Sequence, residues 1–242
     1  MKILIIRHAD PDYTIDSLTE KGKKEAELLS QRLIKSNIKR SYVSPLGRAK
    51  HTAEYTLKKL GKKATVCDWL REFHAPINRP DKTEKIIPWD WYPTDWTKTE
   101  NFFDTEKWGK NPIMEEGKVA EEYTRVTNEF DKILASHGYV RNGKLYNAVN
   151  PNEDTIAFFC HFGVECVLLS HLLNISPMVM WHGFCAAPSS VTTLATEERA
   201  KGAAYFRMNS FGDISHLYVA DEEPSFAARF CETYDNFNQR HD

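Results

Sequence analysis

The stretch Lys2-Ile-Leu-Ile-Ile-Arg-His-Ala9 decides the fold of this 242-residue chain. Its apolar run from Ile3 to Ile6 is rich in β-branched residues and is typical of a strand that is buried on both faces. Such strands occur in parallel sheets that carry helices on both sides. Arg7 and His8 follow at the carboxyl end of the strand, which is the edge where α/β sheets bind their ligands.

Helical and strand patterns alternate along the rest of the chain. Thr19 is predicted to cap a helix whose buried face carries Leu29 and Leu33, and Ser44-Pro45 is predicted to open a second helix with Ser44 as its cap. Further predicted elements are strands at 41–43, 64–67, 156–160, 191–195 and 204–208, helices at 119–138, from 163 and at 225–237, and a hairpin at 139–146. The order predicts an α/β fold with a doubly wound, mostly parallel sheet flanked by helices.

Composition and charge narrow the possible functions. Hydrophobic residues make up 41% of the chain, which is enough for a packed core, and its length favours a single domain over residues 1–242. The net charge of −2 includes no basic excess, so nucleic acid is not expected as a partner. No apolar run is long enough for a membrane span or a secretory signal. Five cysteines without a C-x-x-C spacing favour a reducing, cytoplasmic location.

The segment from His74 to Gly117 breaks the alternation of strands and helices. It holds five prolines and four of the six tryptophans, without regular periodicity. Long connections of this kind are often binding loops or lids, so we interpret residues 74–117 as an insertion folded over the site. Its aromatic residues, together with Arg79, Lys82 and Lys85, suggest selection of a ring-bearing or anionic leaving group.

Basic residues are predicted to meet at the carboxyl edge of the sheet. Arg7 and His8 follow the first strand, Arg48 lies just inside the helix after the second, and His161 follows the strand at 156–160. Two guanidinium groups match phosphate oxygens, and they roughly balance a phosphate monoester of about −1.5 to −2 charges if one histidine is also charged. A neutral imidazole can attack phosphorus. The pattern therefore points to phosphoryl transfer through a phosphohistidine.

The same residues resemble motifs of the histidine phosphatase (phosphoglycerate mutase-like) superfamily, in the same order along the chain. The matching stretches are Arg7-His8-Ala9, Leu18-Thr19-x-x-Gly22-x-x-x-Ala26, Ser44-Pro45-Leu46-x-Arg48-Ala49-x-x-Thr52-Ala53, Leu70-Arg71-Glu72, His161, Ser190-Val191-Thr192 and His216-Leu217. They span nearly the whole chain. The segment 74–117 has no counterpart in this resemblance.

The resemblance implies a role for each matching residue. His8 would be the nucleophile, Arg7, Arg48 and His161 would form the phosphate pocket, and Glu72 would be the general acid. It implies neither a cofactor nor a metal. Phe162 stands where a glycine commonly follows the second histidine, so it would narrow the floor of the phosphate pocket.

Two assignments stay open on the sequence. The aromatic-Glu-Gly run that commonly follows the acid is missing, so Glu84, Asp81 or Asp90 are alternatives to Glu72. Asp10 either orients a histidine or binds substrate, or it caps its own loop.

Three functions are compatible with these residues. The leading one is a metal-independent phosphomonoester hydrolase that acts on a small phosphorylated metabolite. The second is a phosphoglycerate mutase, but mutases of this family carry a longer Asn- and Trp-containing segment where only residues 10–17 stand here. The third is a non-catalytic phosphate-binding domain. The physiological substrate and the oligomeric state cannot be read from the sequence.

Overall fold

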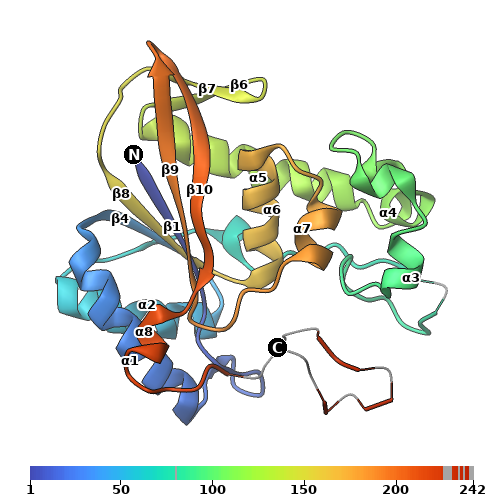
Figure 1. The fold of residues 1–242 in the computed structure, drawn as a ribbon, viewed down its shortest axis with the longest axis horizontal. Coiled ribbons are helices and arrows are strands. Elements are labelled where there is room, and N and C mark those ends of the chain that lie inside the picture. Colours follow the sequence, from blue (N-terminus) through green and yellow to red (C-terminus); the bar gives the residue numbers. More distant parts are fainter. Residues whose placement is uncertain (80, 226–230, 234, 237, 240–242) are drawn as a thin grey trace.

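The computed structural model describes residues 1–79, 81–225, 231–233, 235–236 and 238–239. Its centre is an eight-stranded sheet, shown in Figure 1. The strands, in order across the sheet, are β5 (Thr65–Val66), β4 (Ile38–Val43), β8 (Thr155–Cys160), β1 (Lys2–Arg7), β9 (Val191–Ala200), β10 (Ala203–Asp213), β7 (Leu145–Ala148) and β6 (Tyr139–Asn142). The first four run parallel, and the remaining four continue the sheet in antiparallel pairs.

Helices cover both faces of the sheet (Figure 1), which confirms the predicted fold class. The main helices are α1 (Glu20–Leu33), α2 (Gly47–Leu60), α5 (Val119–Ser136), α6 (Phe162–Leu173) and α7 (Pro177–Gly183). Alternating side chains of β1 divide between the two cores: Leu4 and Ile6 pack with α1 and α2, whereas Ile3 and Ile5 join the core of α5 and α6.

The register of β1 against β8 positions the site. Arg7 pairs with Cys160 at the end of the two parallel strands. Both strands end at the same level of the sheet, so His8 and His161, which follow them, lie side by side. The backbone N–H of His8 donates to the carbonyl oxygen of Cys160 at 3.0 Å and holds the ends of the two strands together.

Several predicted elements agree with the structure, and one cap does not. Thr19 caps α1 by accepting a hydrogen bond from the N–H of Gly22. Ser44, however, does not cap α2, which begins at Gly47. The prediction was wrong because the Ser44 hydroxyl is committed to His161, 2.7 Å away, while the Asp16 carboxylate accepts from the N–H of Gly47 instead.

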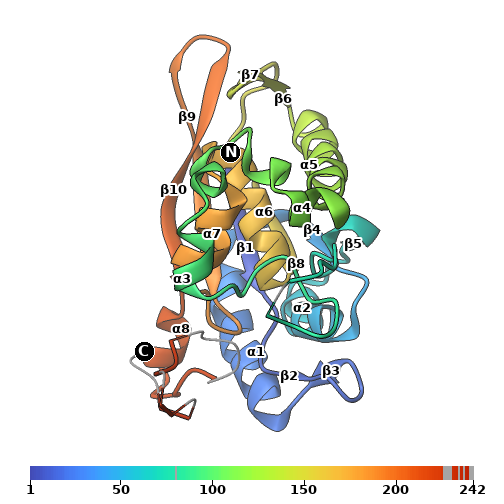
Figure 2. The same ribbon diagram turned by 90° about the vertical axis from the view of Figure 1, so that its right-hand side faces the viewer.

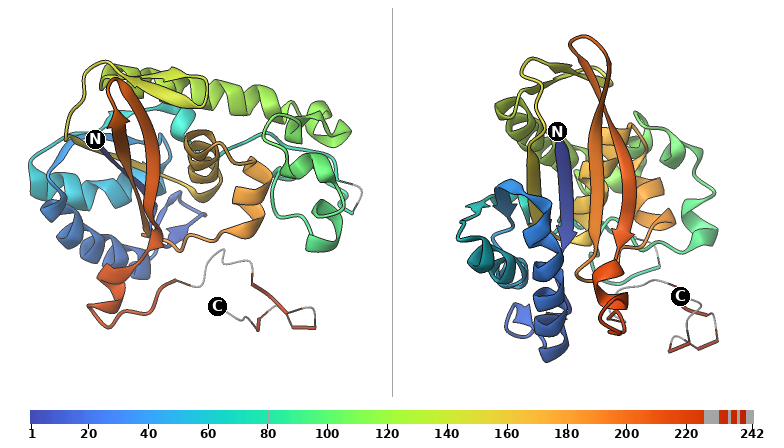
Figure 3. Two further views of the ribbon diagram at one scale, coloured as in Figure 1. Left: turned by 45° about the horizontal axis from the view of Figure 1, so that its top comes forward. Right: turned by 60° about the vertical axis from the view of Figure 1, so that its left-hand side comes forward.

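The strands predicted at 191–195 and 204–208 are longer in the structure, where they are β9 and β10. β9 and β10 form one long hairpin, which is clearest in the right-hand view of Figure 3, and β6 and β7 form the hairpin predicted around residues 142–143. The short helix α8 (Ser215–Tyr218) and the helix α7 were not predicted. Much of the helix predicted over 225–237 falls on residues outside those described.

Residues 74–117 fold into short pieces that lie against α7 (Figure 2). These pieces are α3 (Pro93–Trp96), α4 (Pro112–Glu116) and the 3-10 turns Glu100–Phe103 and Trp108–Lys110. The Ser176 hydroxyl at the start of α7 donates to the carbonyl oxygen of Phe102. Trp89 and Trp108 are buried in the core, so two of the four tryptophans of this segment serve packing. Among the described residues, no helix has the length and apolarity required to cross a bilayer.

Candidate active site

His8 and His161 face each other where β1 and β8 end. Their ring centroids are 5.0 Å apart at an interplanar angle of 61°, and both rings are buried, with relative exposures of 2% for His8 and 0% for His161. His8 Nδ1 lies 2.8 Å from the carbonyl oxygen of Ala9. A carbonyl only accepts, so Nδ1 carries the ring proton and Nε2 keeps its lone pair.

Arg7 is held beside the two rings by backbone and aromatic contacts. Its Nη1 donates to the carbonyl oxygen of Ala186 at 2.5 Å, and its guanidinium carbon lies 5.8 Å from the centre of the Phe162 ring. Arg7 Nε is buried without a hydrogen-bond partner among the described residues. Phe162 therefore supports the guanidinium group with its ring, while Arg7 retains donors for an anion.

Arg48, from the first turn of α2, faces the same site and is paired with Asp16. Arg48 Nη1 lies 2.6 Å from Asp16 Oδ1, and the Tyr13 ring lies 5.3 Å from the guanidinium carbon. The turn that carries Tyr13 and Asp16 joins β2 (Pro11–Asp12) to β3 (Ser17–Leu18). A side chain at Gly47 would overlap with the Asp16 carbonyl oxygen, so glycine allows this turn to dock on α2.

His161 is oriented by the Ser44 hydroxyl. Ser44 Oγ accepts from the N–H of Leu46 and lies 2.7 Å from His161 Nε2. His161 Nδ1 is buried and has no hydrogen-bond partner within the described part of the chain. If Ser44 donates to Nε2, the ring proton is on Nδ1, which then remains a donor for a bound oxyanion.

The Glu72 carboxyl lies in space beside the N-terminus of α6, the helix that begins directly after His161. Its carboxylate accepts from the N–H groups of Phe73 at 2.8 Å, Val164 at 3.0 Å and Gly163 at 3.3 Å. The residue keeps some exposed surface, but protein surrounds its carboxyl group. Desolvation therefore raises the pKa of Glu72 above the usual 4.5, although the three N–H donors and Arg7 act in the opposite direction.

The two histidines are held in their neutral forms. Burial, and secondarily the positive charge of Arg7, lower the pKa of His8 to about 3. Burial also lowers the pKa of His161, with further contributions from His8, Arg48 and Arg7. At neutral pH the site therefore combines two cationic arginines with two uncharged imidazoles.

The order of these residues along the chain matches a known family. The family model of the histidine phosphatase superfamily (branch 1) matches residues 3–208, from β1 into β10. The chain belongs to the histidine phosphatase superfamily. The predicted resemblance is thereby confirmed.

Solved structures share the fold of this histidine phosphatase at low sequence identity. A phosphoserine phosphatase mutant from Entamoeba histolytica, bound to phosphoserine, is 19% identical, with a TM-score of 0.58 over 89% of this chain and 98% of its own. A mycobacterial glucosyl-3-phosphoglycerate phosphatase is 16% identical, with a TM-score of 0.58 over 87% and 98% of the two chains. A mycobacterial hydrolase is 17% identical, with a TM-score of 0.59 over 92% and 97%. No curated protein sequence matches the chain.

The structure of this histidine phosphatase brings together Arg7, His8, Arg48, Glu72 and His161. Of the alternative acids, Glu84 is exposed. The carboxylate of Asp81 is paired with Arg79. Asp90 lines a cavity between the 74–117 segment and α7 whose described lining includes none of these five residues. Asp10 accepts from the hydroxyls of Thr19 and Ser225, which agrees with a role in capping its own loop.

Glu165 is a buried acid that the sequence analysis missed. It has no exposed surface, and its Oε1 accepts from the Thr192 hydroxyl at 2.5 Å. Its other oxygen, Oε2, has no hydrogen-bond partner among the described residues. Burial raises the pKa of Glu165 to about 7, while Arg7 lowers it and Glu72 raises it. The signal available in the sequence was a carboxylate within the otherwise apolar stretch Val164–Leu169.

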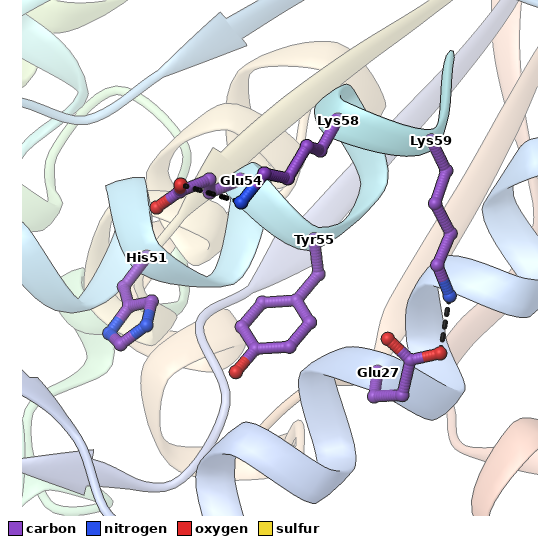
Figure 4. Close-up of a pocket in the computed structure, with 6 residues that line it drawn as sticks. All are labelled: Glu27, His51, Glu54, Tyr55, Lys58 and Lys59. Carbon is purple, nitrogen blue, oxygen red and sulfur yellow. Dashed lines mark hydrogen bonds and ion pairs between the residues drawn. The ribbon is translucent and has the colours of Figure 1, made fainter. Parts of the chain in front are cut away.

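A groove between α1 and α2 (Figure 4) has neither His8 nor His161 among its lining residues. Its volume is about 450 Å³, and its lining residues include His51 and Tyr55. Glu27 is paired with Lys59, and Glu54 lies 3.8 Å from Lys58. Because its acidic groups are paired with its own lysines, we assign no ligand to this groove. Nowhere in the described ranges do three His, Cys, Asp or Glu side chains form a group suited to a metal ion.

Replacing Gly163 by alanine is expected to damage the site. The added Cβ would overlap with the Trp89 ring and lie 2.7 Å from Glu72 Oε1. We expect a loss of about 1–3 kcal/mol in the free energy of unfolding, measured in urea, together with reduced turnover of alkyl phosphates. Gly183→Ala is the stability control, because a Cβ there meets no atom within 4 Å. Equal stability of the two variants would contradict the tight packing at Gly163.

Proposed function

We propose that this histidine phosphatase is a phosphomonoester hydrolase that works through a phosphohistidine at His8. The main support is the geometry of His8, whose Nδ1 is engaged by the Ala9 carbonyl so that the unprotonated Nε2 is the nucleophile. Arg7, Arg48 and His161 are proposed to bind the phosphoryl oxygens. Their donors supply the stabilisation of developing negative charge that phosphoryl transfer requires.

The proposed reaction has two steps. In the first, His8 Nε2 bonds to phosphorus as the bond to the ester oxygen breaks, and the Glu72 carboxyl gives its proton to that oxygen. In the second, water attacks phosphorus, the bond to Nε2 breaks, and the Glu72 carboxylate takes the proton of the water. Orthophosphate leaves, and both residues return to their starting states.

The pairing of Arg48 with Asp16 fits this proposal. Asp16 Oδ1 engages Arg48 Nη1, and Asp16 Oδ2 engages the N–H of Gly47. The Asp16 carboxylate thus engages a guanidinium group and a backbone N–H at a helix N-terminus. Both kinds of donor also bind phosphate oxygens. Trp89 brings the segment 74–117 next to Glu72. We propose that this segment belongs to the same domain and covers the side of the site where the leaving group binds.

Trapping the covalent intermediate tests the proposal directly. The protein is mixed with ³²P-labelled phosphomonoester and quenched within milliseconds in alkaline detergent, because phosphohistidine is labile in acid. We expect label on the wild-type protein at a peptide that contains His8, and none on His8→Asn. Turnover without any trapped label at His8, under conditions where a known phosphohistidine enzyme is labelled, would contradict the proposed nucleophile.

The mutase alternative predicts a different product. A mutase converts 2-phosphoglycerate and 3-phosphoglycerate into each other, whereas a hydrolase releases orthophosphate. The short connection over residues 10–17, which folds into the β2–β3 turn, favours hydrolysis. We expect orthophosphate release from p-nitrophenyl phosphate and no interconversion of the two phosphoglycerates. A non-catalytic domain would bind phosphate esters and do neither.

The pH dependence of turnover is expected to depend on the leaving group. Because the pKa of His8 is lowered to about 3, the nucleophile stays unprotonated throughout the neutral range. Glu72 must be protonated to act as an acid, so turnover of an alkyl phosphate falls as the pH rises through the raised pKa of Glu72. An aryl phosphate needs less protonation of its leaving oxygen. We therefore expect a basic limb in kcat/KM for propyl phosphate that is weak or absent for p-nitrophenyl phosphate.

A further inference from the structure

A cavity of about 860 Å³ lies between the 74–117 segment and α7. Its lining combines ring-bearing side chains, which include Trp89, Trp91, Trp96, Trp181, His182 and Phe184, with charged and polar residues. A volume of this size exceeds what a small ester such as phosphoserine fills, and it falls in the range of ordinary ligand pockets.

The cavity borders the catalytic site, since Trp89 and Trp181 line it and both contact Gly163. Trp89 and Glu72 both pack against the α-carbon of Gly163, on the side where a Cβ would point. The indole N–H of Trp181 donates to the carbonyl oxygen of Gly163 at 3.0 Å. Cys185, which also lines the cavity, directly precedes Ala186, whose carbonyl oxygen holds Arg7. The Glu72 carboxyl, the proposed proton donor to the leaving group, therefore lies next to Trp89, which is one wall of this cavity.

Several polar groups of the ring-bearing walls are already engaged in hydrogen bonds. The indole N–H of Trp91 donates to the carbonyl oxygen of Pro88, and that of Trp181 is engaged by Gly163. His182 uses both ring nitrogens: Nδ1 pairs with the Met178 carbonyl oxygen, and Nε2 accepts from the Trp91 backbone N–H. An aromatic ring placed here would stack on the exposed faces of these side chains.

Among the described residues that line the cavity, two are cationic, Arg79 and Lys82, and two are acidic, Asp90 and Glu232. Arg79 pairs with Asp81 and lies over the Trp91 ring, with 5.0 Å between its guanidinium carbon and the ring centre. Lys82 lies 5.8 Å from the centre of the Tyr92 ring, and both cations interact electrostatically with the carboxylates of Asp81 and Asp90. The cavity is therefore suited to an uncharged group and not to a second anion.

From these observations we propose that the cavity binds the leaving group of the substrate, and that this group carries an uncharged aromatic ring. The inference rests on the proposed hydrolase function, because it assigns the alcohol part of the phosphomonoester. It narrows the substrate class to phosphate esters whose alcohol carries an aromatic ring. The phosphate would lie at His8 and the ring between Trp91, Trp96 and Phe184.

Three primary alkyl esters with similar reacting groups test the proposal: 2-phenylethyl phosphate, propyl phosphate and glucose 6-phosphate. Each releases a primary alcohol, so differences in kcat/KM report mainly on binding of the rest of the leaving group. We expect 2-phenylethyl phosphate to be hydrolysed with a kcat/KM at least about tenfold above the other two. Equal values for the three esters, or a preference for glucose 6-phosphate, would overturn the proposal.

Variants locate the preference in the cavity. Trp96 is half-buried and stacks on His182 with 5.0 Å between ring centres, so Trp96→Ala removes one aromatic wall. We expect this variant to bring the kcat/KM ratio of 2-phenylethyl to propyl phosphate close to one. Tyr218→Ala, an exposed aromatic residue on α8, is the matched control and should keep the wild-type ratio. A ratio that Trp96→Ala leaves unchanged would contradict the assignment.

Binding of unreactive analogues separates failure of this inference from failure of the proposed function. The phosphonates 2-phenylethylphosphonate and propylphosphonate cannot be hydrolysed, and calorimetry measures their affinities for the wild-type protein. We expect the phenylethyl compound to bind about tenfold more tightly. If no ester is hydrolysed and this difference in affinity is present, the hydrolase proposal fails and the ring site stands. If esters are hydrolysed and the affinities are equal, the ring site fails and the hydrolase stands.

Discussion

His8→Ala is expected to abolish turnover of every phosphomonoester, with a loss on the order of 10⁴-fold or more. At this site only His8 has its Nδ1 held by a backbone carbonyl, which leaves Nε2 unprotonated and able to attack phosphorus. His161 cannot replace it, because its Nε2 is engaged by Ser44. The measurement is steady-state release of orthophosphate from p-nitrophenyl phosphate and from propyl phosphate.

A control for this variant must separate chemistry from folding. His8 is buried against His161, so its removal leaves a cavity, and we expect a modest fall in thermal stability with a retained circular dichroism spectrum. His137→Ala is the matched control, since His137 follows α5 and bonds to the Tyr42 hydroxyl at 2.8 Å instead of joining the site. Residual activity of a folded His8→Ala protein above about 1% of wild type would discard the nucleophile assignment.

Glu72→Gln is expected to slow alkyl phosphates by about 10²–10⁴-fold and aryl phosphates far less. An alkoxide is a poor leaving group and needs a proton, whereas a nitrophenolate leaves without one. Glutamine keeps the volume of Glu72 and can still accept from the N–H groups of Phe73 and Val164 through Oε1, and it loses only the longer bond from Gly163 at 3.3 Å. The ratio of kcat for propyl phosphate to kcat for p-nitrophenyl phosphate measures the effect.

Asp81→Asn is the comparison variant, because Asp81 was an alternative acid on the sequence. The structure pairs it with Arg79 and leaves it outside the histidine pair, so its removal should not change the dependence on the leaving group. Equal slowing of alkyl and aryl esters in Glu72→Gln would move the general acid elsewhere. A selective loss of alkyl turnover in Asp81→Asn would move it to the 74–117 segment.

Local patterns were sufficient for the main elements of the fold. The apolar run of β1, the cap at Thr19 and the spacing of α5 are properties of neighbouring residues, and each appears in the structure as predicted. Convergence of Arg7, His8, Arg48 and His161 followed from one general rule, that parallel strands end at the same edge of a sheet. The register of Arg7 opposite Cys160 provides that convergence in three dimensions.

Contacts between distant segments were beyond the reach of those patterns. Asp16 replaces Ser44 as the cap of α2, Glu72 reaches the N-terminus of α6 across 91 residues, and Glu165 is buried beside Thr192. None of these pairs has a characteristic spacing, because each depends on how loops dock onto helices after the sheet has formed. The chain by itself determined the sheet, the family and the basic residues at the strand ends. Only the tertiary structure decided which carboxylate meets which N–H group and where the tryptophans enclose a cavity, since hydrogen bonding and burial act on distances in space and not on positions along the chain.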